Sequence, residues 1–278
     1  MNTPVAIERN GHRTLLKWHR ARRNKLDTPF TGSRIRDCMG AGGSVEIDLQ
    51  VDGSGNFVVL HDERLEQSTT GFGPVNETSS DDLRGLHILD VKGEDSGERV
   101  MMLDDLADLV VKGPVREGAV LQLDMKDELE AFHDNSIGIF ARTIAPVARH
   151  MILSGMDSAA VRALADAVKD LPVGYDPCKE DVVLAVLESG DFAGLVRDTL
   201  ETAPWASMIY LEYQFVLAAD RAGFDMIGAF HDAGKQVDAW TIRTIDESTC
   251  PQIERLLALK ADQITTDDPD AFYAHFAL

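Results

Sequence analysis

The segment SVEIDLQVDGSGNFVVLHD (44–62) places two carboxylic acids inside one apolar run and ends a second apolar run on His-Asp. In VEIDLQV the apolar and polar residues alternate strictly, which is typical of a strand with two unlike faces. Glu46 and Asp48 therefore point the same way, about 6 to 7 Å apart along the strand. A solvated outer face would explain this pattern, and a cation site on an inner face is the alternative.

Polar residues of types that take part in catalysis also stand at the ends of other short apolar runs. The candidates are His19 with Arg20, Glu46 with Asp48, His61 with Asp62, Asp124 with Lys126, Glu212 and Trp240. They are far apart in the sequence, so they could act together only if the fold brings the ends of these runs to one place.

The combination of side chains indicates cleavage of a phosphate ester. Three carboxylates in one place need a neutralising charge, and a hard divalent cation such as Mg²⁺ or Ca²⁺ supplies it through oxygen ligands. Two imidazoles can carry protons near neutral pH, and arginine and lysine can hold an anionic substrate. A metal and cations would stabilise charge on the non-bridging oxygens while the histidines move protons at the attacking and leaving oxygens.

The elements that must position these residues follow from the pattern of the whole chain. Apolar runs alternate with helix-like stretches at 33–40, 79–86, 103–112, 134–149, 157–168, 180–200, 214–221, 224–233 and 247–260. Strands spaced by helices predict βα units and a parallel sheet. Eight such units in about 270 residues predict a closed (β/α)₈ TIM barrel, in which active residues gather at the C-terminal ends of the strands. An open doubly wound sheet is the alternative, but no glycine-rich phosphate loop follows any strand.

The predicted domain organisation is a single barrel domain over residues 1–278. No linker divides the chain, and NFVVLH extends the second βα unit. Residues 62–100 are rich in Gly, Ser and Thr with one short helical pattern, which predicts an excursion on the C-terminal face of the barrel.

Composition limits the partners. Lys and Arg total 27 against 47 Asp and Glu, so the net charge is −20, which disfavours nucleic acid and anionic membranes. Residues 12–25 are locally basic, which suits a small anion. The three cysteines are widely spaced, and the first residues lack the apolar stretch of a signal peptide. We therefore expect a reduced, cytoplasmic protein without a zinc site.

Several segments match one family in their order and spacing. They are WHRA, VEID, FVVLHDERLEQSTTGFGPV, LQLDMK, VDAWTI and ADQITTDDPD. Through them the sequence resembles, over residues 14–272, the glycerophosphodiester phosphodiesterase family, whose barrel is of the phosphatidylinositol-phosphodiesterase type. The corresponding family motifs are His-Arg-Gly, Glu-x-Asp, Val-Val-x-His-Asp, Glu-x-Lys and Trp-Thr.

The resemblance implies a role for each candidate residue. The acid–base pair would be His19 and His61, the ligands of Mg²⁺ or Ca²⁺ would be Glu46, Asp48 and Asp124, the phosphate would be held by Arg20 and Lys126, and Trp240 would line the pocket beside the alcohol. The implied reaction is hydrolysis of a glycerophosphodiester, or a related small polyol phosphodiester, to a phosphomonoester and an alcohol.

Other interpretations of single residues stay open at this point. His12 also precedes an arginine and competes with His19 for the first motif. Lys126 could balance neighbouring acids on the surface, and Trp240 could be a core residue. The sequence also departs from the family: Ala21 replaces the motif glycine, Leu26-Asp27-Thr28 replaces Glu-Asn-Thr, and Asp124 replaces glutamate. A turn that needs a positive φ at Ala21 would be strained or re-formed.

Two other functions compete with the diester hydrolase. A phospholipase of the sphingomyelinase D kind, forming a cyclic phosphate, shares the barrel and the two-histidine, metal-bound site. A non-catalytic polyol-phosphate binder would fit the altered turn at Ala21 and the shorter acid at Asp124. A binder, however, has no need of two histidines at the barrel mouth.

Overall fold

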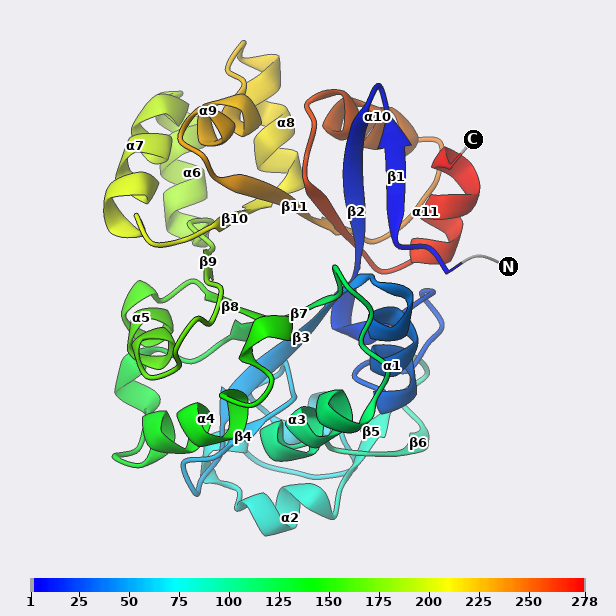
Figure 1. Cartoon of the computed structure of the whole chain (residues 1–278), viewed down its shortest axis with the longest axis vertical. Coiled ribbons are helices and arrows are strands. Elements are labelled where there is room, and N and C mark those ends of the chain that lie inside the picture. The colour runs from blue at the N-terminus through cyan, green and yellow to red at the C-terminus, as the bar shows by residue number, and fades with distance from the viewer. Residues whose placement is uncertain (1–2, 278) are drawn as a thin grey trace.

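Eight parallel strands close into a barrel in the computed structural model, which describes residues 3–277 (Figure 1). These strands are β2 (His12–Trp18), β3 (Ser44–Val51), β7 (Val120–Met125), β8 (Met151–Gly155), β9 (Gly174–Tyr175), β10 (Met208–Glu212), β11 (Gln236–Ile242) and β12 (Gln263–Thr266). Their order is β8–β7–β3–β2–β12–β11–β10–β9, and a parallel bridge between Leu153 and Val173 joins the two ends. The predicted (β/α)₈ barrel is confirmed, and the open doubly wound sheet is excluded.

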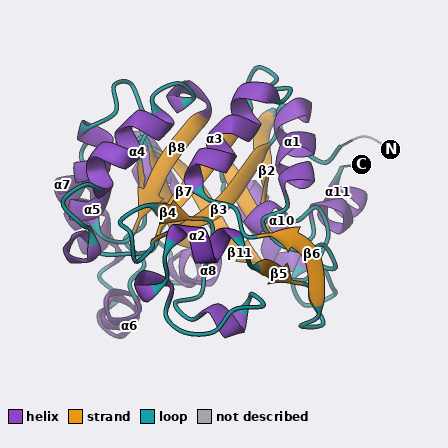
Figure 2. Ribbon diagram, turned by 90° about the horizontal axis from the view of Figure 1, so that it is seen from below, coloured by secondary structure: helices purple, strands orange, loops and turns teal. Residues whose placement is uncertain are grey.

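Helices surround the barrel, as Figures 1 and 2 show. They are α1 (Gly32–Ala41), α3 (Leu103–Lys112), α4 (Ser136–Ile144), α5 (Ser158–Asp166), α6 (Glu180–Ser189), α7 (Phe192–Thr202), α8 (Tyr213–Arg221), α9 (Met226–Asp232), α10 (Cys250–Ala258) and α11 (Pro269–Phe276). The single helix predicted over 180–200 is wrong. Gly190 adopts φ 73° after α6 and ends it, and Asp191 then caps α7 by accepting a hydrogen bond from the Gly194 N–H.

Four short strands and a small helix lie outside the barrel. β1 (Ala6–Arg9) pairs antiparallel with β2, and β4 (Phe57–Val58) pairs antiparallel with β3, which confirms the predicted extension of the second unit. Within residues 62–100 lie α2 (Ser80–Arg84) and the antiparallel pair β5 (His87–Leu89) and β6 (Asp95–Arg99). A small apolar cluster that includes Leu65, Val75 and Ile88 packs beneath this segment.

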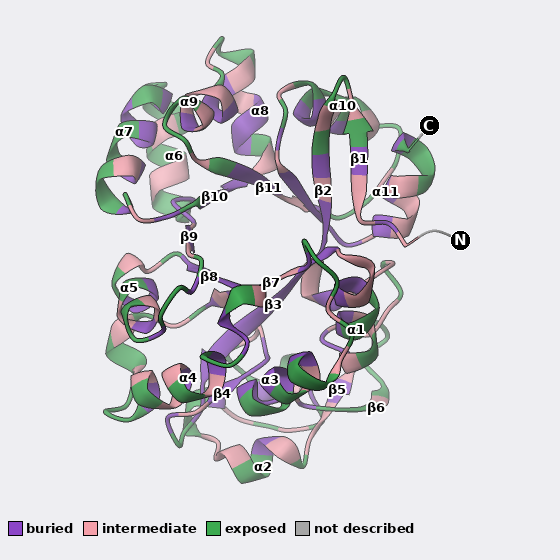
Figure 3. Cartoon of the chain, in the orientation of Figure 1, coloured by how far each residue is buried: buried purple, intermediate pink, exposed green. Residues whose placement is uncertain are grey.

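The apolar core is divided between two halves of the chain. One buried cluster is drawn from residues 18–171 and a second mainly from residues 178–276. Figure 3 shows buried positions in purple along the strands of both halves. In each, apolar residues of the strands pack against the inner faces of the surrounding helices, for example Ile47 with Ile35 and Phe140, all fully buried. Nowhere in residues 3–277 is there a helix both long enough and apolar enough to span a bilayer.

Candidate active site

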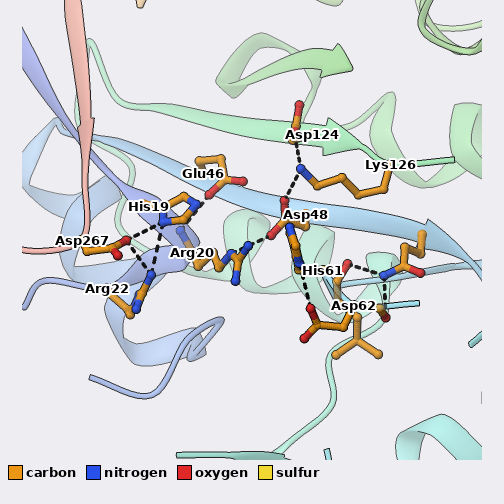
Figure 4. A network of polar contacts seen from close by, with 12 residues as sticks. His19, Arg20, Arg22, Glu46, Asp48, His61, Asp62, Asp124, Lys126 and Asp267 are labelled. Atoms are coloured by element: carbon orange, nitrogen blue, oxygen red, sulfur yellow. Dashed lines mark hydrogen bonds and ion pairs between the residues drawn. The ribbon is translucent and has the colours of Figure 1, made fainter. Parts of the chain in front are cut away.

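Strands β3 and β7 bring three carboxylates together inside the barrel (Figure 4). Glu46 and Asp48 lie on β3, where both faces are buried, and are 4% and 1% exposed. Asp124 lies opposite Asp48 on β7. Ligand oxygens of the three side chains lie within 4.8 Å of one another. The solvated outer face is therefore ruled out for Glu46 and Asp48.

Two cations lie against these acids. The Lys126 Nζ is 2.7 Å from Asp48 Oδ1 and 2.5 Å from Asp124 Oδ2, and the Arg20 Nε is 3.2 Å from Asp48 Oδ2. Burial opposes ionisation of Asp48, but these two positive charges outweigh it and lower its pKa. Burial also opposes protonation of Lys126, yet the surrounding carboxylates raise its pKa.

Glu46 is the acid that the cations leave uncompensated. Its Oε2 accepts a hydrogen bond from the Arg20 backbone N–H at 2.7 Å. Burial, and then the neighbouring charge of Asp48, raise the pKa of Glu46 well above its usual range. Without a further positive charge the cluster therefore disfavours full ionisation of its three acids.

The cluster fits a divalent cation. Both carboxylate oxygens of Asp48 are buried without a hydrogen bond of good geometry, although the ion pairs with Lys126 and Arg20 are close. Oxygens within 4.8 Å of one another can share one ion, because Ca²⁺ and Mg²⁺ bind oxygen at about 2.0 to 2.6 Å. The donors are all hard oxygens, which suits these two ions and not a zinc site.

His19, at the end of β2, is held by an aspartate that the sequence reading did not single out. Its Nδ1 lies 2.5 Å from Asp267 Oδ1, and the same oxygen accepts a hydrogen bond from Arg22 Nη2 at 2.5 Å. Burial lowers the pKa of His19 despite the opposing hydrogen bond and charge of Asp267. The pair favours a neutral imidazole that donates from Nδ1 and keeps a lone pair on Nε2.

His61 follows β4 and is more open to solvent. Its Nδ1 lies 2.9 Å from Asp62 Oδ1, and its side chain is 38% exposed. The buried Gln50 amide fixes this turn by donating to the carbonyls of Leu60 and Asp62 at 3.1 and 3.0 Å. His61 can thus carry a proton with its orientation set by Asp62.

The turn after β2 has the conformation that the motif glycine would favour. Arg20 and Ala21 adopt φ values of 53° and 57°, in the left-handed region. The expected strain at Ala21 is therefore present, since a residue with a Cβ pays about 1 to 2 kcal/mol there. The turn directs the Arg20 N–H at Glu46 and its carbonyl at the Phe30 N–H.

A cavity of about 200 Å³ joins these parts. The predicted residues that line it are His19, Arg20, Glu46, His61, Asp124, Lys126 and Trp240. Asp48 lies at 1% exposure behind them, against Arg20 and Lys126. The fold thus brings every predicted site residue to one place, and Trp240 lies at the cavity rather than in the core alone.

Some sequence candidates lie elsewhere. His12 contacts the Ala261 carbonyl at 3.1 Å, before the start of β12 and so at the opposite end of the barrel from His19. Glu212 caps α8 by accepting a hydrogen bond from the Phe215 N–H, and it is absent from the cavity wall. Asp27 binds Arg34 at 2.8 Å and shapes the loop after β2.

Other cavity residues were missed by sequence reasoning. Asp176 follows β9 and Arg243 follows β11, and both line the cavity. Burial raises the pKa of Asp176 to about 7. Asp176 directly follows β9 and Asp267 directly follows β12, so the strand-end rule that found His19 could have found them too.

The sequence and the fold of this chain are similar to those of known proteins. A model of the glycerophosphoryl diester phosphodiesterase family matches residues 39–271, whereas no curated protein matches the chain. A candidate glycerophosphoryl diester phosphodiesterase from Agrobacterium tumefaciens superposes with a TM-score of 0.71 at 19% identity, covering 94% of this chain and 96% of its own. For a glycerophosphodiester phosphodiesterase from Thermotoga maritima the TM-score is 0.64 at 18% identity, with 95% and 99% covered. A phosphodiesterase from Oleispira antarctica, in complex with the product sn-glycerol-3-phosphate, has a TM-score of 0.67 at 18% identity, with 93% and 95% covered.

Proposed function

Because the chain belongs to the glycerophosphoryl diester phosphodiesterase family of hydrolases, we propose that it hydrolyses a glycerophosphodiester, or a related small polyol phosphodiester, to a phosphomonoester and an alcohol. The observation that carries the proposal is the single cavity that joins two imidazoles, the carboxylate cluster and two cationic side chains. The complex of the Oleispira antarctica protein with sn-glycerol-3-phosphate supports the same class of product for this chain.

The carboxylate cluster gives the proposed metal site. Glu46, Asp48 and Asp124 would hold one Mg²⁺ or Ca²⁺, and the ion would supply positive charge to the non-bridging phosphate oxygens. Arg20 and Lys126, which neutralise Asp48 in the structure, add the charge that holds the substrate phosphate.

The two histidines divide the proton transfers in this proposal. His19, whose pKa is lowered by burial, is neutral near pH 7 and accepts the proton of the attacking group at Nε2, while Asp267 holds Nδ1. His61, more exposed and paired with Asp62, donates its proton to the leaving alcohol oxygen. The attacking group is water in direct hydrolysis, or a neighbouring substrate hydroxyl in the route through a cyclic phosphate.

The proposal also covers how the alcohol portion of the substrate is bound and how the chain is organised as a domain. Trp240 lines the cavity wall and would pack against the alcohol portion of the substrate. The chain would act as one catalytic domain, with residues 62–100 as an excursion on the face that carries the site.

The test is turnover of bis(p-nitrophenyl) phosphate and of glycerophosphodiesters, before and after EDTA, with Mg²⁺ or Ca²⁺ added back. We expect activity to vanish with the chelator and to return with one of the ions. His61→Asn should lower turnover about 100-fold or more, whereas His12→Asn, at the opposite end of the barrel, should not. Binding of a glycerophosphodiester without any turnover would contradict the proposal and support a binding protein.

A further inference from the structure

A charged pair is buried inside the barrel, and its lysine helps to line the cavity. The Lys17 ammonium, on β2, lies 2.9 Å from Asp238 Oδ2, on β11, and the two side chains are 2% and 0% exposed. Burying two charges costs several kcal/mol per ion before their attraction is counted, and barrel interiors are usually filled by branched apolar side chains. Stability alone therefore does not explain why this charged pair lies inside the barrel.

The Lys17 ammonium has two further contacts besides the ion pair with Asp238. Its Nζ contacts Gln122 Oε1 on β7 and lies 4.3 Å above the centre of the Tyr210 ring. The other oxygen of Asp238 accepts a hydrogen bond from Thr265 Oγ1 at 2.7 Å. Lys17 is thus held by side chains from β7, β10 and β11, which reach it across the barrel interior, since β2 itself pairs with β3 and β12.

The contact with Lys17 sets the direction of a chain of hydrogen bonds that runs toward the carboxylate cluster. An ammonium can only donate, so the Gln122 amide must present its oxygen to Lys17 and its nitrogen elsewhere. The Gln122 Nε2 donates to Ser154 Oγ at 2.8 Å. The Ser154 hydroxyl accepts that bond, and its own proton goes to Asp124 Oδ1 at 2.7 Å.

We propose that Lys17, Gln122 and Ser154 are positioning residues that hold Asp124 for its role as a ligand in the carboxylate cluster. The inference rests on the proposed function, because it takes Asp124 as a ligand of a divalent cation. Lys17 fixes the amide of Gln122, the amide fixes the hydroxyl of Ser154, and the hydroxyl fixes one oxygen of Asp124. The second oxygen, Oδ2, then lies 2.5 Å from the Lys126 Nζ, which also contacts Asp48.

The chain of hydrogen bonds also explains why the buried pair consists of a cation and an anion. Asp238 neutralises Lys17, so the pair adds no net charge next to a cation site. What it contributes is the direction of the hydrogen bonds, since an apolar pair at these positions would leave the Gln122 amide free to turn over. Ser154 would then donate to Gln122 Oε1 instead of to Asp124.

Three variants and one control test this arrangement. Ser154→Ala removes the hydroxyl that binds Asp124, and Gln122→Glu keeps the oxygen for Lys17 but removes the donor to Ser154. The double variant Lys17→Met/Asp238→Leu removes the pair without leaving an unpaired charge, which favours folding. Ser44→Ala is the control, because Ser44 is a similarly buried strand hydroxyl whose only side-chain hydrogen bond within residues 3–277 goes to Gln263, at 3.4 Å.

The measurement is calorimetric titration with Mg²⁺ or Ca²⁺ alone, followed by turnover at limiting and at saturating metal. Loss of a group that orients a ligand typically weakens metal affinity about 10- to 100-fold. We expect that loss in Ser154→Ala, a loss in the same direction in the other two variants, and recovery of most of kcat at saturating metal. Ser44→Ala should bind metal as the unaltered protein does.

The outcomes separate the two proposals. Unchanged metal affinity in Ser154→Ala and in the double variant would overturn the inference while leaving the proposed function intact. An equal loss in Ser44→Ala would overturn it too, since the effect would then be one of packing. If the unaltered protein binds no divalent cation, the proposed metal site fails, and the inference fails with it.

Discussion

Asp176 gives a quantitative test of the electrostatics of the cavity. This residue follows β9, is 7% exposed, and accepts a hydrogen bond from the Cys178 N–H at 2.8 Å. Burial, helped by the charge of Asp124, raises its pKa from 3.8 to about 7. Asp176→Asn keeps an oxygen for the Cys178 N–H but removes the ionisable group.

The expected change in the free energy of unfolding follows from the difference between the pKa of Asp176 in the folded protein and its usual value. Because the folded protein holds the proton of Asp176 more tightly than the unfolded chain, the free energy of unfolding falls as the pH rises from about 4 to 7. About three pKa units at 1.36 kcal/mol each give roughly 4 kcal/mol as an upper value. Water reaching the cavity screens the charge and reduces this to about 2 to 4 kcal/mol.

The direction of this change in the free energy of unfolding can be checked directly. Asp176→Asn should have the same free energy of unfolding as the unaltered protein at pH 4 and a value higher by about 2 to 4 kcal/mol at pH 8. The assay is urea unfolding at pH 4, 6 and 8 with EDTA present, because a bound cation would favour the ionised acid.

A control variant should respond in the opposite direction. Hydrogen bonds from Ser248 and Thr249 lower the pKa of Asp246 to about 2, so Asp246→Asn should lose stability above pH 4. A difference between Asp176→Asn and the unaltered protein that is the same at pH 4 and pH 8 would refute the reasoning, because an uncharged packing effect does not depend on pH.

Three further predictions concern the reaction. His19→Ala should lower kcat/KM by about 100- to 10,000-fold, as measured in steady-state assays with saturating metal; near-normal activity would exclude His19 as the base. Asp267→Asn should move the acid limb of the pH profile of kcat/KM to lower pH, because the hydrogen bond and charge of Asp267 raise the pKa of His19 against the effect of burial; a limb that stays in place or moves up would contradict this. Trp240→Ala should raise KM for glycerophosphodiesters more than for bis(p-nitrophenyl) phosphate, and equal changes for both substrates would argue against a role for Trp240 at the alcohol.

The strands and most of the candidate site could be predicted because they follow from local patterns. Strict alternation in VEIDLQV fixed which residues of β3 share a face, and the barrel rule then placed Glu46 and Asp48 near His19. The same alternation puts Asp238 and Trp240 on one side of β11, so the inward direction of Asp238 could also have been inferred.

Features that depend on long-range contacts could not be predicted in this way. The partner of Lys17 is chosen by the closure of the barrel, which brings β2 beside β12 and near β11. The strand β6 is polar and mostly exposed, and β5 has only three residues, so neither shows the alternating apolar pattern that marks a strand. The last helix, α11, was missed for another reason, because its start is marked locally: Asp268 caps it by accepting a hydrogen bond from the Ala271 N–H, and Pro269 is its first residue.

The order of the strands also determines when the site is complete during synthesis. Lys17 lies on β2 and His19 directly follows it, near residue 20, whereas Asp238 lies on β11 and Asp267 follows β12. As the chain leaves the ribosome, the first apolar cluster can form before those acids have been made. Until β11 and β12 have joined the sheet, Lys17 lacks Asp238 beside it and His19 lacks Asp267, so the candidate site is complete only once the barrel closes.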